Sequence, residues 1–355
     1  MNVTWRTWFE LTRISNLPSV ITSCLVGVFM ITPLALDPLL VVGTVLPLLL
    51  AIAFIYLGGF VLNDVFDLEI DRSERPGRPL PSGRVSVFGA GRLAIALMCS
   101  ALVLVMLGEL VSARAAGETG GLQIAFPWGL AAALVLVVLV FLYDWFHTRS
   151  AWWVLAMGGC RGMVYVTCLL VMTDQLEFTA RRPLVLEYLT WPNLIALPVV
   201  PFILSMSLYV AAFSLIARSE VRDEQGEGAT IPRWLRNGCL ACTFLPLMTL
   251  MVVKLAGGLV AWSRNSEAVM NSPLFRGDML MTVVSSGLAA VWFILAWRRY
   301  LARPHSPGGA IQMWIAGIAL LDAVYLIQYG QGILSVACLL LFAVTVWGHK
   351  RIKGT

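Results

Sequence analysis

The sequence predicts an all-α, polytopic membrane protein with nine to ten transmembrane helices. Of its 355 residues, 59% are hydrophobic and only 13% are charged, which excludes a disordered chain and argues against a soluble multidomain protein. Apolar runs of about 17–25 residues, the length that spans a bilayer as a helix, recur from end to end. These runs leave no room for a separate soluble domain, so we expect residues 1–355 to form one membrane domain.

Ten segments have the length and apolar character of membrane spans, and the first eight are the clearest. The last two are separated by Tyr329-Gly330-Gln331-Gly332, which is either a break within one membrane-crossing unit or a tight turn between two. The expected spans lie near residues 17–36, 40–62, 87–111, 124–143, 151–173, 193–217, 238–261, 279–297, 310–327 and 331–348.

The distribution of basic residues predicts how the chain is oriented. With ten spans and the N-terminus inside, most of the 25 lysines and arginines fall on one side of the membrane, which is a strong positive-inside bias. With nine spans, the basic tail 350–353 would lie outside, which the same bias disfavours. We therefore expect the N-terminus and the motif-bearing loops to face the cytoplasm. The net charge of +5 is accounted for by this topology and does not indicate nucleic-acid binding.

The strongest chemical signal is a cluster of acidic and basic residues in the first inner loop, residues 63–84. Asp64, Asp67 and Asp71 stand at i, i+3 and i+7, so they share one face if the segment is helical. A carboxylate at the bilayer centre costs roughly 2.5–3.5 kcal/mol on the insertion scale, so such a cluster at a membrane boundary indicates a use. Three hard oxygen ligands suit Mg²⁺ bridged to a phosphate. The alternative is a solvated acidic helix end with a basic loop that sets the topology.

The pattern Asn-Asp-x-x-Asp-x-x-x-Asp, followed by Arg-Pro-x-Arg-Pro-Leu-Pro-Ser-Gly, resembles the first aspartate-rich motif of the UbiA-type intramembrane prenyltransferases. Within that family it looks most like the branch that transfers geranylgeranyl or phytyl-like chains. The resemblance implies a helical bundle around a lipid-accessible cavity, in which Mg²⁺ holds an isoprenyl diphosphate. It implies that Arg78 contacts the diphosphate. The residues that it assigns to the metal and diphosphate cluster are Asn63, Asp64, Asp67 and Asp71.

A second signal lies at the inner end of the fourth span, residues 142–149. UbiA-type enzymes have a tyrosine and one or more basic residues near the diphosphate, and Tyr143, His147 and Arg149 are the matching positions, although the usual lysine is absent. The alternative is an interfacial belt of aromatic and basic anchors. Asn16, at the start of the first span, matches a polar position that many family members have in their first helix.

Two ionisable residues lie within predicted spans. Arg161 is in the fifth span, and an arginine at membrane depth marks a functional or paired site by default; the glycines around it would let helices approach closely. We expect Arg161 to lie in the cavity and act on the diphosphate, with a purely structural ion pair as the alternative. Asp322, in the ninth span, is expected to face the bundle interior, where it orients an acceptor hydroxyl or pairs with Arg161 or Lys254.

The second aspartate motif of the family, often Asp-x-x-x-Asp at the inner end of the sixth helix, is altered here. Glu220 is the first candidate for a metal ligand in this segment and Asp223 the second. Arg218 and Arg222 are candidates to neutralise the diphosphate. The departure from the usual aspartates leaves open whether a second Mg²⁺ binds, and a solvated charged loop is the alternative.

These features predict Mg²⁺-dependent transfer of a prenyl group from an isoprenyl diphosphate to a small or lipid acceptor within the membrane. Proteins that resemble this chain use aromatic acids, quinone precursors, tetrapyrroles and glycerol phosphate lipids, and the sequence does not choose among them. Membrane lipids are the expected surroundings, and nothing indicates a protein partner.

Three other functions fit the sequence less well. A non-catalytic protein that binds isoprenoid lipid on the same fold is favoured by the altered second motif. A transporter would place ionisable residues at the midplane, and only Arg161 and Asp322 fit that description. CDP-alcohol phosphotransferases also use aspartates at a membrane interface, but they require an Asp-Gly pair, and here Asp67 is followed by Leu68.

Overall fold

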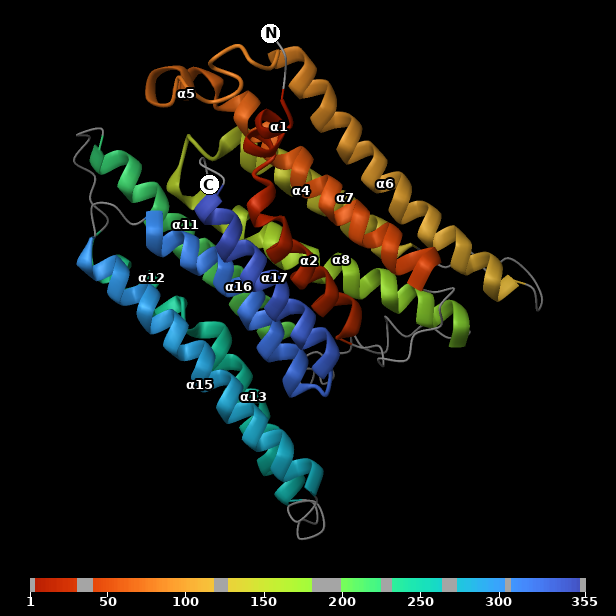
Figure 1. Ribbon diagram of the computed structural model, residues 1–355. Helices are drawn as coiled ribbons and strands as arrows, with labels where there is room; N and C mark the ends of the chain where they lie inside the picture. Colours follow the sequence, from red (N-terminus) through yellow and green to blue (C-terminus); the bar gives the residue numbers. More distant parts are fainter. Residues whose placement is uncertain are drawn as a thin grey trace.

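Figure 1 shows the computed structural model as a bundle of long helices, and the residues that it describes include no strand. The described residues are 4–30, 41–117, 127–180, 199–224, 232–263, 273–303 and 308–351. The helices are α1 (Trp5–Leu11), η1 (Ile14–Asn16), α2 (Leu17–Phe29), η2 (Val41–Val45), α4 (Leu46–Phe66), α5 (Leu68–Glu74), α6 (Val87–Gly117), α7 (Trp128–Phe146), η3 (Ala151–Trp153), α8 (Val154–Ala180), α11 (Val199–Glu224), α12 (Arg233–Cys242), α13 (Leu245–Ser263), α15 (Pro273–Ala302), α16 (Gly308–Gln328) and α17 (Gly332–Arg351).

The number of membrane spans agrees with the sequence prediction. In the described part of the chain, eight helical segments are long and apolar enough to cross a membrane. Two bent pairs, α1 with η1–α2 (63°) and α12 with α13 (50°), raise the number to ten if each counts as one span. The chain is thus an integral, multi-pass membrane protein. The segment between the last two helices is a tight turn, in which Gly330 has a φ of 78° that favours glycine.

α2 lies at the centre of the bundle and packs against α8, α16 and α17 (Figure 1). Small residues permit the close contacts. A Cβ on Gly27 of α2 would lie 2.7 Å from the Cβ of Cys168 on α8. A Cβ on Gly158 of α8 would overlap the backbone carbonyl of Ser207 on α11. The glycines around Arg161 therefore bring α8 and α11 together, as the sequence suggested.

The break between α1 and α2 places one residue in an unfavourable backbone conformation. Arg13 has a φ of 45° and a ψ of 47°, and it is the only non-glycine residue in the described part of the chain with a positive φ. Its carbonyl accepts a hydrogen bond from the hydroxyl of Tyr56 on α4 (3.2 Å). A left-handed non-glycine residue costs on the order of 1–2 kcal/mol, so contacts from other elements must hold this break in place.

The start of α7 is capped by carboxylates from two other helices. Its N-cap residue is Pro127, which makes no side-chain cap. The backbone N–H of Leu130 donates to Glu109 on α6 (2.8 Å), and the N–H of Gly129 donates to Asp174 on α8 (2.7 Å). Both acids are buried. They satisfy amide groups that a helix start leaves unpaired.

We predict that Glu109→Ala lowers the free energy of unfolding by about 0.5–2 kcal/mol, the usual range for loss of a helix cap. Glu109→Gln keeps an oxygen acceptor and should lose less. The measurement is the thermal unfolding midpoint of detergent-solubilised protein. Leu110→Ala is the matched control, because Leu110 is the next residue and is exposed on the bundle surface. A midpoint for Glu109→Ala no lower than that of the control would contradict the capping role.

Candidate active site

A cavity of about 1230 Å³ lies among α2, α4, α7, α8, α11 and α16. Along the helices that form its wall, the lining residues change from apolar to charged or polar. On α4, the lining begins with Ile52 and Ile55 and ends with charged residues at the end of the helix. On α7, Leu136 and Val140 precede the polar side chains of the last turn. The cavity therefore has a charged mouth and an apolar interior.

Most of the site residues predicted from the sequence line this one cavity, although they come from separate helices and loops. Arg149 and Asp322 do not line it, and the side chains of Glu220, Arg222 and Asp223 lie outside the described part of the structure. The predicted residues that do line it are Asn16, Asn63, Asp64, Asp67, Asp71, Arg78, Tyr143, His147, Arg161 and Arg218.

The spacing of the three aspartates predicted one shared face if the segment is helical, and the structure divides that segment into two helices. α4 ends at Phe66, Asp67 is the junction residue, and α5 begins at Leu68. Hydrogen bonds nevertheless continue the helical pattern across the junction, from the N–H of Asp67 to the carbonyl of Asn63 (2.9 Å) and from the N–H of Asp71 to the carbonyl of Asp67 (2.8 Å). This continuity keeps all three carboxylates on the side of the cavity.

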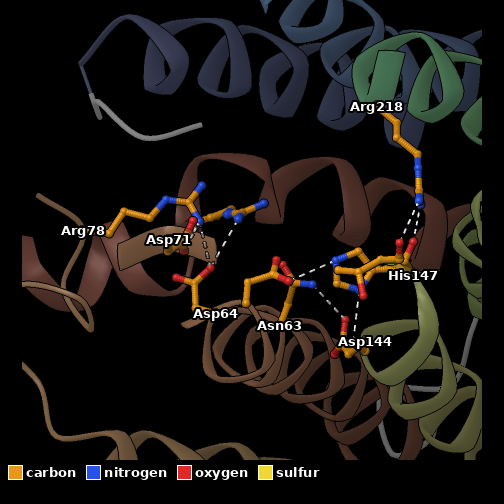
Figure 2. Close-up of polar contacts among 10 residues, drawn as sticks. Asn63, Asp64, Asp71, Arg78, Asp144, His147 and Arg218 are labelled. Carbon is orange, nitrogen blue, oxygen red and sulfur yellow. Dashed lines mark hydrogen bonds and ion pairs between the residues drawn. The ribbon is translucent and has the colours of Figure 1, made fainter. Parts of the chain in front are cut away.

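Two arginines neutralise the buried aspartates (Figure 2). The guanidinium of Arg78 lies 2.6 Å from a carboxylate oxygen of Asp71 and 3.4 Å from one of Asp64. Arg13, which the sequence analysis did not select, lies 3.3 Å from the same oxygen of Asp64 and over the ring of Phe60. Because carboxylates without partners are costly to bury, these arginines allow Asp64 and Asp71 to stay buried together.

The position of Arg78 depends on the turn between α5 and α6. The N–H of Ser82 donates to the carbonyl of Arg78 (3.1 Å), and Arg84 donates to the carbonyl of Gly77 (2.7 Å). Gly83 has a φ of 71°, a conformation that glycine adopts without steric cost. The proline-rich segment is thus a defined turn, as expected, and it directs Arg78 back toward the aspartates.

A second group of contacts joins the ends of α4 and α7 (Figure 2). The Nε2 of His147 lies 3.1 Å from a carboxylate oxygen of Asp67, and its Nδ1 lies 3.0 Å from the carbonyl of Asp144. Burial lowers the pKa of His147, but the hydrogen bond to Asp67 and the charge of that carboxylate outweigh it, so the pKa is raised above its usual value.

Asp144 is a site residue that the sequence analysis did not select. Its side chain is buried and lines the cavity, and its Oδ1 accepts a hydrogen bond from the amide of Asn63 (3.3 Å). Its Oδ2 is buried with no hydrogen-bond partner among the described residues. The available signal was an aspartate at the inner end of an apolar span, next to the selected Tyr143. In this contact the NH₂ group of Asn63 is the donor and Oδ1 of Asp144 is the acceptor.

Arg161 and Asp322 belong to one buried network, but they do not form a direct ion pair. Arg161 donates to the carbonyl of Ser19 (3.0 Å) and to the hydroxyl of Ser23 (3.2 Å) on α2. Asp322 accepts from Ser23 (3.0 Å), and also from Tyr165 and Thr22 (2.7 Å each). Ser23 therefore links the cavity arginine to the buried carboxylate, and the network ties α2, α8 and α16 together.

Two other basic residues that the sequence predicted at the site, Arg218 and Arg149, contact neighbouring parts of the protein. Arg218 on α11 donates to the backbone carbonyls of His147 and Thr148, which follow α7. It thereby holds the segment that carries His147 (Figure 2). The guanidinium of Arg149 lies 4.9 Å from the ring centre of Phe146, consistent with the interfacial alternative considered for this segment.

The donor set of the cavity mouth fits Mg²⁺. Carboxylate oxygens are the ligands that Mg²⁺ prefers, and Mg²⁺ commonly takes only one or two of them together with substrate phosphates and water. In the described part of the chain, no group of three or more His, Cys, Asp or Glu side chains forms a complete metal site. The Oδ2 of Asp144 is buried without a hydrogen-bond partner among the described residues, so an oxygen ligand is available at the cavity beside the aspartates.

Comparison with known proteins identifies the family. A sequence model of the UbiA prenyltransferase family matches residues 20–318. The chain belongs to this family. The resemblance seen in the first inner loop is therefore confirmed over most of the chain.

Individual relatives match only part of the chain or share low sequence identity with it. A digeranylgeranylglyceryl phosphate synthase of Sulfolobus acidocaldarius is 37% identical over 99 residues, which is 28% of this chain and 34% of that protein. The chain thus matches about one third of the length of this curated relative. A UbiA homologue from Aeropyrum pernix, solved without ligand, covers 88% of this chain and 98% of its own, with a TM-score of 0.57 and 18% identity. A UbiA homologue from Archaeoglobus fulgidus, bound to DMAPP and Mg²⁺, covers 89% and 99%, with a TM-score of 0.50 and 16% identity. These structural likenesses support the fold.

We predict that Asn63 and Asp144 are energetically coupled. Asn63→Asp places two carboxylates face to face and should lower the unfolding midpoint more than Asp144→Asn does. The double variant Asn63→Asp/Asp144→Asn restores a carboxylate opposite an amide, so it should be more stable than the sum of the two changes by about 0.5–3 kcal/mol.

The coupling is measured as a double-mutant cycle on thermal or denaturant unfolding in detergent. Trp145→Phe is the matched control on the same turn of α7, because Trp145 is exposed and does not line the cavity; paired with Asn63→Asp, it should give additive changes. Additive changes for Asn63 and Asp144 as well would contradict the inferred contact.

Proposed function

We propose that this protein transfers a prenyl group from an isoprenyl diphosphate to an acceptor within the membrane, in a Mg²⁺-dependent reaction. One observation supports this most directly: carboxylates and arginines gather at the mouth of a cavity whose interior is apolar. A diphosphate carries concentrated negative charge and a prenyl chain carries none, so the two ends of such a donor match the two ends of this cavity.

The arginines would bind the diphosphate. Arg13, Arg78 and Arg161 all line the cavity, and a guanidinium offers several donors to phosphate oxygens. When a diphosphate enters, Arg13 and Arg78 gain a more highly charged partner than Asp64 and Asp71. This exchange would leave carboxylate oxygens of Asp64 and Asp71 available to hold Mg²⁺.

Mg²⁺, when bound by Asp64, Asp67 and Asp71, would stabilise charge on the departing diphosphate. The protein supplies the remaining conditions. Charged donors fixed before the reaction stabilise the leaving group without reorganisation. Apolar walls exclude water from the activated prenyl carbon. The hydroxyphenyl ring of Tyr143 also lines the cavity. An aromatic face there can stabilise positive charge that develops on the prenyl group.

The matched relative's name also indicates an acceptor to test first. A digeranylgeranylglyceryl phosphate synthase makes a glyceryl phosphate that carries two geranylgeranyl chains. We propose a glyceryl phosphate carrying one such chain as the first acceptor and geranylgeranyl diphosphate as the first donor. The bias of basic residues toward one side supports a cavity mouth at the cytoplasmic face.

We predict that Asp64→Asn reduces Mg²⁺-dependent consumption of geranylgeranyl diphosphate by about 100-fold or more, since changes one shell further from a metal already cost 10–100-fold. The measurement uses radiolabelled donor in membranes, with and without excess chelator. Glu69→Gln is the matched control, because Glu69 lies on α5 but is exposed and pairs with Arg72 outside the cavity.

Full turnover by Asp64→Asn would show that the cluster does not act in the reaction. Mg²⁺-dependent binding of the donor without turnover, for any acceptor tested, would instead favour a non-catalytic protein that binds isoprenoid diphosphates.

A further inference from the structure

The last helix contacts a residue of the cavity wall, Asn16, although this helix lies beyond the part of the chain that matches the family. The family match ends at residue 318, within α16, and α17 begins at Gly332. α17 packs against α16 and α2, and its end contacts η1, the short turn between α1 and α2. A Cβ on Gly348 would lie 3.1 Å from the Cβ of Ser15, so the two backbones are close at this point.

At this contact, α17 holds a cavity residue by its side chain. The Nε2 of His349 lies 2.6 Å from the Oδ1 of Asn16. An amide oxygen can only accept a hydrogen bond, so Nε2 is the nitrogen that carries the proton. Asn16 is itself buried and lines the cavity. The contact joins residues that lie at opposite ends of the sequence.

The hydrogen bond decides which end of the amide faces the cavity. With Oδ1 bound to His349, Asn16 donates one N–H of its NH₂ group to the hydroxyl of Tyr56 and has the other N–H to offer. An NH₂ group donates to the oxygens of an anion, whereas an amide oxygen repels them. Without His349, the amide is able to rotate by half a turn and present either end. The same short segment carries Arg13, whose strained backbone and ion pair with Asp64 require its position to be fixed.

We propose that His349 is a positioning residue for the prenyl donor: it orients Asn16 so that the amide NH₂ binds a phosphate oxygen of the diphosphate. The C-terminal helix thereby completes the donor site. This inference rests on the proposed function and goes further, because it names a residue outside the family match that governs donor affinity.

Three substitutions separate this role from simple packing. The side-chain nitrogen of glutamine lies about as far along the chain as Nε2 of histidine, so His349→Gln retains the donor. The nitrogen of asparagine corresponds in reach to Nδ1, so His349→Asn is polar but too short. His349→Ala removes the donor altogether. Lys350→Ala is the matched control, because Lys350 is the adjacent residue of α17 and is exposed.

The experiment measures two quantities on the full-length protein in detergent. One is the Kd for the S-thiolodiphosphate analogue of geranylgeranyl diphosphate with Mg²⁺, by calorimetry. The other is the KM and kcat for geranylgeranyl diphosphate. We expect His349→Ala and His349→Asn to raise Kd and KM by about 3- to 10-fold, the equivalent of one hydrogen bond, with kcat nearly unchanged. His349→Gln and Lys350→Ala should remain close to the unmodified protein.

Equal losses in all three His349 variants, in parallel with their unfolding midpoints, would overturn the proposal and leave only a packing role for α17. Unchanged Kd in His349→Ala would overturn it as well. If the unmodified protein binds the analogue but turns over no donor, the proposed transferase activity fails; a rise in Kd confined to His349→Ala and His349→Asn would then still support the positioning role.

Discussion

Buried carboxylates at a membrane boundary need cationic partners, and this requirement governs the architecture of the charged end of the bundle. Asp64 and Asp71 share Arg78, and Asp64 has Arg13 as a second partner. Each arginine comes from a different segment: one from the turn after α5, the other from the break before α2. The ion pairs therefore tie three separate parts of the chain to the end of α4. Removing one partner of a buried pair leaves an uncompensated charge, which costs several kcal/mol.

The helix breaks at the charged end of the bundle also bring carboxylates and their cationic partners together. The 63° bend between α1 and η1–α2 lies at Arg13, and with this bend the guanidinium of Arg13 is 3.3 Å from Asp64. The junction at Asp67 lets α5 leave the bundle axis while Asp71 remains at the cavity. Breaks in regular structure are tolerated at membrane depth where protein surrounds them. Here Tyr56 and Asp64 support the break at Arg13.

Deeper in the bundle, neutral hydrogen bonds replace ion pairs. Among the described residues, no cation contacts Asp322 directly, and three hydroxyl donors satisfy it instead. One of those hydroxyls, on Ser23, also accepts from Arg161. Such a network depends on the exact partners present, because a half-satisfied buried group is costly. It fixes Arg161 at the cavity wall and gives α2 its place between α8 and α16.

The sequence by itself determined the helical membrane fold, the positions of the spans and the cluster at residues 63–84. These features are local: apolar length specifies a span, and the aspartate motif with its proline-rich turn is continuous in the chain. The residues that pair with that cluster could not be predicted from local sequence. Arg13 with Asp64, Asn63 with Asp144 and Asn16 with His349 are pairs separated by many residues, and the sequence gives no sign of which distant side chains will meet.

The helix junction at Asp67 was also missed, since the spacing of the aspartates suits one continuous helix as well as two. Which arginine neutralises which carboxylate depends on how the helices cross and where their backbones bend. Those crossings follow from the packing of small residues such as Gly27 and Gly158 against neighbouring helices. The chemistry available at the cavity mouth was therefore encoded locally, while its arrangement was decided only when the helices packed, because packing alone brings distant charges within reach of one another.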